Sequence, residues 1–261
     1  GLVRTSQGYV LVDTPYKPSD ALRLRAEIEA EGVPLRYIVN TEPHGDHWTG
    51  NAFFDAPVIG HEGVRARMVG YDMVEHLKRV AAFGPDEPAL VADYQARPPT
   101  ITFTDGLTLH LGETTFRILG MPGHTRYQAA VIVEEEGVVF TSDNLFSGVH
   151  TWLHEGDPDR WYIALDRLRA LDQEVFVPGH GKVAGKAALD SQEAFIREWV
   201  DYVRTAIDRG LSRDEAVDQL TDMTDRFPMD VEQEGMAPSV MRRNVANLYD
   251  FHTRQGIHAA G

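Results

Sequence analysis

Thr41-Glu42-Pro43-His44-Gly45-Asp46-His47 is the stretch that decides the fold, and it directly follows the apolar run 35–40. Four of its seven side chains can bind a metal ion: Glu42, His44, Asp46 and His47. A strand that ends in a glycine-containing loop can carry such groups on a turn, and closely spaced imidazole and carboxylate ligands suit zinc, iron or manganese. The stretch therefore predicts a metal site at the carboxyl end of a strand.

The residues before this stretch predict a strand, a helix and a second strand. Residues 8–15 form a short apolar run closed by Asp, Thr and Pro, which is typical of a buried strand. Ser19 predicts the N-cap of a helix that ends at the Gly-Val-Pro of 32–34. Since binding sites in such β-α-β units lie at the carboxyl ends of the strands, the run 35–40 would deliver the four ligands to that position.

Three later segments each follow an apolar strand and each carry one further candidate ligand: Pro122-Gly123-His124, Ser142-Asp143 and Pro178-Gly179-His180-Gly181. In this order, and together with the first stretch, they resemble the metallo-β-lactamase superfamily, whose motif is His-x-His-x-Asp-His. The departure is Glu42, which stands where the family normally has its first histidine. The resemblance covers residues 8–181 and implies an α/β (α+β) fold, a four-layer αββα sandwich.

The resemblance implies a metallo-β-lactamase core at residues 1–185, and the wholly helical pattern of residues 186–261 predicts a helical cap packed on the same domain. Within the core, residues 69–98 carry no strand pattern and predict an insertion. An insertion of this kind is either a lid over the site or a helical cover that buries its own aromatic side chains. The sequence leaves both alternatives open.

Seven metal ligands follow from the family resemblance, in two sets joined by one bridging carboxylate. One ion would be held by Glu42, His44 and His124, the second by Asp46, His47 and His180, and Asp143 would bridge both ions, with a water or hydroxide between them. The resemblance also implies a structural role for Asp13, which would hold the ligand loop.

Glu42 decides which metal the site would prefer. A glutamate carboxylate can reach a metal ion at about 2.0–2.2 Å, much as an imidazole does. The alternative is that Glu42 swings away and acts as a base beside the site or as a solvated residue. If Glu42 binds, each ion has two histidines and one carboxylate in addition to the bridge, a donor set associated with non-haem iron. Two divalent ions are therefore expected, with zinc, iron and manganese as candidates.

Two reaction classes fit these ligands. In the first, the chain is a hydrolase in which a metal-bridging hydroxide attacks a small ester, lactone, thioester, amide or phosphoester. Asp46 and Asp143 would be its catalytic carboxylates, and the segment 143–158 most resembles the generic hydrolases of the family. In the second, the chain is a di-iron or di-manganese oxygenase of the same fold. A binding module without catalysis is a third reading, in which a complete ligand set would have no task.

Candidate substrate contacts are few: His150, Trp152, His154 and Tyr94. The first three closely follow the predicted bridging Asp143, and the alternative for them is packing or surface exposure. His110 lies in an alternating strand and is expected at the surface, and the remaining histidines are expected to be structural or exposed: His61, His76, His252 and His258.

The net charge and the residue composition exclude some classes of binding partner. The formal net charge is −15, which opposes binding to nucleic-acid phosphates, so a small-molecule substrate is expected. No apolar run approaches a membrane span, and the absence of cysteine fits a reducing cytoplasm. Because the chain opens in what reads as the middle of a strand, residues upstream of Gly1 are expected to be missing from this sequence.

Overall fold

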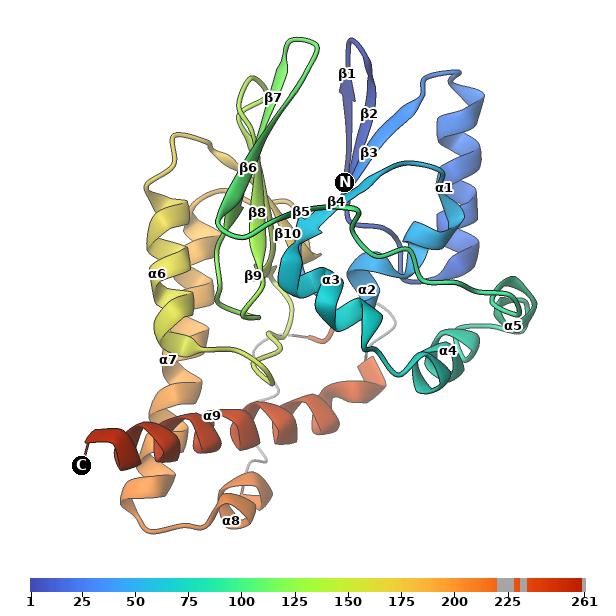
Figure 1. The fold of residues 1–261 in the computed structure, drawn as a ribbon. Coiled ribbons are helices and arrows are strands. Elements are labelled where there is room, and N and C mark those ends of the chain that lie inside the picture. Colours follow the sequence, from blue (N-terminus) through green and yellow to red (C-terminus); the bar gives the residue numbers. More distant parts are fainter. Residues whose placement is uncertain (220–227, 231–233, 260–261) are drawn as a thin grey trace. The chain divides into compact units, whose positions relative to one another are not determined.

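The computed structural model describes residues 1–219, 228–230 and 234–259 (Figure 1). By its internal contacts the chain divides into two compact units. The first unit contains Gly1–Met121 and Tyr127–Phe140, and the second contains Pro122–Arg126 and Thr141–Gly261. The segment around His124 therefore belongs to the second unit, although it lies within the sequence of the first.

The first unit holds a five-stranded sheet with the order β1-β2-β3-β4-β5. Its strands are β1 (Leu2–Thr5), β2 (Gly8–Val12), β3 (Leu35–Asn40), β4 (Val58–His61) and β5 (Ile101–Phe103). The first pair is antiparallel and the other three pairs are parallel. All five residues of β2 are buried, which confirms the buried strand predicted there. The carboxyl end of β3 carries the ligand loop, as predicted.

Helix α1 (Pro18–Ala30) connects β2 to β3 and packs on this sheet, where Ala21 and Ile28 join the core formed by the strands (Figure 1). The predicted N-cap at Ser19 is wrong. The helix begins at Pro18, with Lys17 as its N-cap, which is two residues earlier than predicted, and the fixed φ of proline suits the first helical position. The Ser19 hydroxyl instead donates to Oε1 of Glu87 at 2.6 Å, so a distant partner has taken the group that would have capped the helix.

Short helices begin within the ligand loop and continue after it. They are α2 (Gly45–Trp48), the 3-10 helix η1 (Thr49–Phe53), α3 (Glu62–Val69), α4 (Met73–Ala81) and α5 (Glu87–Leu90). Residues 69–98 are all described and form helices and turns, which agrees with the absence of a strand pattern. Their Tyr71 and Met73 pack on a buried cluster formed by Trp48, Val64 and Met68. The insertion thus buries aromatic side chains within the first unit, and its role as a lid stays a prediction.

The second sheet has the order β10-β9-β8-β7-β6. Its strands are β6 (Gly106–Leu111), β7 (Thr114–Gly120), β8 (Ala129–Val133), β9 (Val138–Ser147) and β10 (Val175–Gly181). Strand β9 passes from the first unit into the second, and its first three residues pair with β8. His110 is exposed in β6, as predicted from the alternation of that strand.

Helices make up most of the remaining second unit. They are α6 (Pro158–Arg169), α7 (Ala187–Asp208), α8 (Arg213–Asp218), the 3-10 helix η3 (Glu234–Met236) and α9 (Ala237–Ala259). The predicted stripe of α7 is buried, with Phe195, Trp199 and Val203 in the core. Ser212 caps α8 as predicted, in a reciprocal capping box with Glu215. Among the residues described, no helix is both long and apolar enough to cross a membrane.

Candidate metal centre

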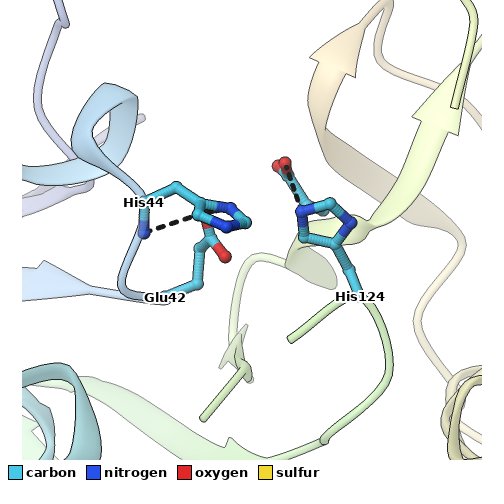
Figure 2. A group of neighbouring side chains, drawn as sticks. Glu42, His44 and His124 are labelled. Atoms are coloured by element: carbon cyan, nitrogen blue, oxygen red, sulfur yellow. Dashed lines mark hydrogen bonds and ion pairs between the residues drawn. The ribbon is translucent and has the colours of Figure 1, made fainter. Parts of the chain in front are cut away.

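The loop after β3 places its two predicted histidines around one carboxylate oxygen. Oε1 of Glu42 lies 2.9 Å from Nδ1 of His44, which Figure 2 shows beside it. The same oxygen lies 3.2 Å from Nε2 of His47. It also accepts a hydrogen bond from the His44 backbone N–H at 3.3 Å. Oδ2 of Asp46 lies 3.8 Å from Nε2 of His47. The four predicted side chains of this loop therefore lie together.

Glu42 is fully buried. The alternative in which it is a solvated residue does not describe this structure, because the carboxylate turns toward the imidazole of His44 (Figure 2) and lies within 3.2 Å of that of His47. Burying an ionised carboxylate is unfavourable unless cations or hydrogen-bond donors surround it. A position between two imidazoles suits either a metal ligand or a hydrogen-bond acceptor beside the site.

Asp13 holds this loop at two points. Its Oδ1 accepts from the Thr41 backbone N–H at 2.8 Å, and its Oδ2 accepts from the Thr41 hydroxyl at 2.5 Å. The same Oδ2 lies 2.8 Å from Nδ1 of His47. Asp13 has a positive φ of 55°, a conformation that aspartate tolerates better than most residues. Because an ionised carboxylate only accepts, Nδ1 of His47 carries a proton, and Nε2 is the nitrogen that faces Oε1 of Glu42.

The second unit places His124 in a similar way. Its backbone N–H donates to Oδ1 of Asn144 at 3.1 Å, and its Nδ1 lies 2.8 Å from the carbonyl oxygen of Trp152. A carbonyl oxygen can only accept, so Nδ1 carries a proton, and Nε2 is the nitrogen that faces the other ligand groups. This Nε2 lies 3.5 Å from Oδ2 of Asp143.

His180 has the same arrangement on the other side of Asp143. Its Nε2 also lies 3.5 Å from Oδ2 of Asp143, and its Nδ1 lies 3.0 Å from Oδ2 of Asp230. The Asp143 oxygen is thus shared between two imidazole nitrogens, which is the position a bridging ligand needs. The ring of Phe146 stacks on the His180 ring with centroids 5.2 Å apart, which fixes the plane of the imidazole.

The glycines before the two histidines allow close approach of the backbone. A Cβ at Gly179 would overlap Oδ1 of Asp143 and would lie 2.9 Å from the Asp143 backbone nitrogen. A Cβ at Gly123 would overlap Oδ1 of Asn144. Ser142, directly before Asp143, has a positive φ of 51°, a strained conformation of the kind found at functional sites. These contacts explain why each Pro-Gly-His segment has glycine before its histidine: a larger residue would overlap a neighbouring side chain.

These donor sets fit metal ions. Three histidines in the two units, His47, His124 and His180, each have Nδ1 held by a carboxylate or carbonyl oxygen, so that Nε2 points to other ligand groups. This is the usual arrangement around histidines that bind metal, where the partner of the second nitrogen fixes tautomer and orientation. His44 differs, because its Nδ1 is the nitrogen that faces Glu42.

The predicted substrate contacts have more varied positions. Tyr94 donates its hydroxyl to the Thr49 carbonyl at 2.8 Å, and burial raises the pKa of this phenol. His150 is buried edge-on against Phe195 and Trp199, and burial lowers its pKa to about 4. These contacts give Tyr94 and His150 packing roles within their own units, and substrate contact by either stays a prediction.

Trp152 and His154 lie beside His124. Trp152 supplies the carbonyl that orients His124, and the His154 ring lies 5.8 Å from the His124 ring and 5.4 Å from the Trp152 ring. Helix α9 holds their loop, because Asn244 accepts from the Leu153 N–H at 2.6 Å and donates to the Thr151 carbonyl at 2.9 Å. Of the predicted substrate contacts in the second unit, Trp152 and His154 are therefore the two nearest to a ligand.

Sequence reasoning missed Asp230 and His76. Asp230 lies fifty positions after its partner His180, in no motif, so nothing in the local sequence identifies it. His76, from α4, was expected to be structural or exposed, and it is buried against the ligand loop. Burial is the main reason why its pKa falls to about 4. A histidine in a helix without strong local signals could have been singled out only through its tertiary contacts.

Comparison with known proteins identifies the family of this chain. The family model for the metallo-beta-lactamase superfamily matches residues 1–180. Curated relatives include the hydroxyacylglutathione hydrolases of Methylococcus capsulatus, 30% identical over 58% of this chain and 49% of that protein, and of Anaeromyxobacter dehalogenans, 32% identical over 68% and 59%. The chain spans about half the length of the curated relatives it matches.

A solved structure gives the same result for the fold. The metallo-beta-lactamase from Pontibacter korlensis superposes with a TM-score of 0.59 at 21% sequence identity, covering 75% of this chain and 85% of that chain. At this identity the likeness concerns the fold alone.

Proposed function

Because the chain belongs to the metallo-β-lactamase superfamily, we propose that it is a binuclear metal-dependent hydrolase. The fold class predicted from the sequence, an α/β chain of two sheets with helices and a helical C-terminal part, is confirmed. The observation that carries the proposal is the orientation of three imidazoles, His47, His124 and His180, whose Nδ1 atoms are held by oxygen acceptors. In metal sites, an acceptor at Nδ1 fixes the tautomer and the ring orientation of a histidine whose Nε2 binds the ion.

The order of the motifs supports the assignment of ligands. We assign one ion to Glu42, His44 and His124, the second to Asp46, His47 and His180, and the bridge to Asp143. The shared Oδ2 of Asp143, at 3.5 Å from both His124 and His180, supports the bridging role. The burial of Glu42 between His44 and His47 supports its role as a ligand.

The identity of the metal depends on Glu42. Zinc is the first candidate for a hydrolase, and two histidines with one carboxylate at each ion also suit iron or manganese. When bound, the ions would act as Lewis acids on the scissile group and lower the pKa of water toward neutrality.

The protein's own groups would orient the reactants. Asp46 is the least buried carboxylate of the loop, with 30% of its side chain exposed, so it can accept a hydrogen bond from the attacking water. Asp13, the Trp152 carbonyl and Asp230 keep three imidazoles in one tautomer throughout. A pre-oriented polar site of this kind needs little rearrangement as charge develops on the substrate.

The substrate class is a small molecule with a hydrolysable acyl group. Hydroxyacylglutathione, which the curated relatives are named for, is a thioester, so a thioester heads the predicted series of esters, lactones, amides and phosphoesters. Hydrolysis would add water across the C–S bond and release a carboxylate and a thiol. The alternative of a di-iron oxygenase gains no support from these relatives, which are named as hydrolases.

Metal analysis and a substrate panel test the proposal. The chain, purified without added metal, would be analysed for zinc, iron and manganese and assayed with a hydroxyacylglutathione, an aryl ester and a lactone. We expect two ions per chain and hydrolysis of the thioester that is lost on chelation and returns with metal. The exposed His110→Ala serves as the control variant. Full turnover in chelated protein would refute the metal-dependent mechanism.

A further inference from the structure

We propose that His76 is a positioning residue of the metal centre, which holds the turn 45–49 in the shape that presents its metal-binding side chains. The inference rests on the proposed function for the identity of those ligands. His76 belongs to α4 in the insertion at 69–98 and is 1% exposed. Its contacts all lie within the first unit.

The first contact is a hydrogen bond whose direction follows from its neighbours. The Thr49 hydroxyl donates its single proton to the Gly45 carbonyl at 2.6 Å. Nε2 of His76 lies 2.9 Å from the same hydroxyl oxygen, so His76 must be the donor and carries its proton on Nε2. The chain from His76 through Thr49 to Gly45 fixes both ends of the short helix α2, which contains Asp46 and His47.

The second contact is steric. A Cβ at Gly45 would lie 2.5 Å from Cε1 of His76 and 3.1 Å from its Nδ1, well inside the separation of about 3.5–4.0 Å that non-bonded heavy atoms prefer. Gly45 has an ordinary negative φ, so the need for glycine here comes from the His76 ring and not from the backbone conformation. The ring therefore occupies the space next to the residue between His44 and Asp46.

Aromatic packing holds the ring in place. His76 stacks on Trp48 with centroids 4.9 Å apart and on Tyr16 at 5.8 Å, and Tyr71 meets it edge-on at 5.3 Å. Trp48 in turn donates its indole N–H to the Pro43 carbonyl at 2.8 Å. The stacked rings are therefore linked to the backbone on both sides of His44, at Pro43 through Trp48 and at Gly45 through Thr49.

Tyr94, a second residue of the insertion, supports the same turn. Its hydroxyl donates to the Thr49 carbonyl at 2.8 Å. The insertion thus supplies one donor to the side chain of Thr49 and another to its backbone. These contacts make the insertion a brace for the ligand loop.

Three substitutions separate the contributions of the ring and the donor. His76→Gln keeps an amide N–H that can reach Thr49, His76→Phe keeps the stacked ring without a donor, and His76→Ala removes both. Zn²⁺ affinity would be measured by competition with a chelator in variants that unfold cooperatively in urea, with His110→Ala as the matched control. We expect His76→Ala to weaken zinc binding by about 10–100-fold, the usual effect of losing a group that orients a ligand. His76→Gln should recover part of that loss.

Amide hydrogen exchange of the metal-free protein provides a readout that does not depend on metal. We expect exchange in peptides covering 41–52 to rise about tenfold in His76→Ala, equivalent to losing one hydrogen bond, with peptides of β6 and β7 unchanged. Gly45→Ala should be less harmful in the His76→Ala background than alone, because the overlapping ring is gone.

The outcomes separate the two proposals. Unchanged exchange at 41–52, or unchanged zinc affinity in a folded His76→Ala protein, would overturn the positioning role. If the unaltered chain binds no metal, the proposed function fails, and the exchange experiment alone decides whether His76 holds the turn. If it binds metal and does not hydrolyse thioesters, only the proposed substrate class fails.

Discussion

Replacing Asp13 by asparagine should weaken metal binding more than it weakens the fold. Asp13 accepts three hydrogen bonds, two from Thr41 and one from Nδ1 of His47. The asparagine amide has almost the same shape, and its oxygen can still accept from the Thr41 N–H. Its NH₂ group would then face the Thr41 hydroxyl, which can turn to accept, and Nδ1 of His47.

The consequence falls on His47. To accept from an amide N–H, its Nδ1 must give up the proton, which then moves to Nε2, the nitrogen that faces Glu42. A protonated Nε2 cannot bind a metal ion. Binding would require the tautomer to revert, with two N–H groups opposed at Nδ1, and we expect zinc affinity to fall by about 10–100-fold, or about 1.4–2.8 kcal/mol.

The effect on folding should be smaller. Three hydrogen bonds survive in Asp13→Asn, but none of them involves a charged group any longer. A hydrogen bond to a charged group contributes about 1.5–3 kcal/mol to stability, whereas one between neutral groups contributes about 1 kcal/mol. Because 20% of the Asp13 side chain is exposed, water screens part of that difference, and the free energy of unfolding should fall by about 1–3 kcal/mol. Asp13→Ala loses all three bonds and should cost about 4 kcal/mol, yet it leaves His47 able to adopt either tautomer.

Two measurements test whether Asp13→Asn weakens metal binding more than it weakens the fold. Urea unfolding of the metal-free proteins gives stability, and chelator competition gives zinc affinity, with the exposed Asp105→Asn as the control. We expect Asp13→Ala to be less stable than Asp13→Asn. We also expect Asp13→Asn to bind zinc no more tightly than Asp13→Ala does. Nitrogen-15 shifts of the His47 ring should show the proton on Nε2 in Asp13→Asn. Zinc affinity of Asp13→Asn equal to that of the unaltered protein would refute the role of Asp13 in setting the tautomer.

Three further predictions follow from the same geometry. Glu42→His, which restores the family motif, should preserve or raise hydrolysis if the site is a zinc hydrolase; loss of turnover with metal content retained would contradict this expectation. Gly179→Ala should lower the free energy of unfolding by about 1–3 kcal/mol, because its Cβ would meet the backbone of Asp143, whereas Gly70→Ala, with room for a Cβ, should change it little; equal urea midpoints for the two variants would show the Gly179 contact to be unimportant. Burial lowers the pKa of His150 to about 4, so between pH 4 and its ordinary value near 6.5 the unfolded chain binds a proton that the folded chain does not. The resulting stability of about 3 kcal/mol is fully present above pH 6.5 and is lost as the pH falls toward 4; His150→Phe should flatten this part of the stability curve, and an unchanged slope would argue against it.

Metal-binding side chains in fixed spacing, each after an apolar strand, made the family readable from the sequence. Apolar runs alone predicted β2, β3 and the exposed face of β6. A continuous apolar run indicates a strand that is buried on both faces, and alternating apolar and polar residues indicate a strand with one exposed face. The family order of the motifs then supplied the αββα fold and the ligand set as expectations. The fold is confirmed, and the ligand set remains a proposal.

What the sequence could not determine was how those side chains are held. Ser19 has the residue type of an N-cap, but its hydroxyl goes to Glu87, a partner 68 positions away. Asp230 and His76 carry no local signal, since their roles arise from contacts that chain folding brings about. A hydrogen bond that fixes a tautomer, or a ring that requires a glycine beside it, joins residues far apart in the chain and changes if their separation changes by a few tenths of an ångström. Only the tertiary structure sets that separation.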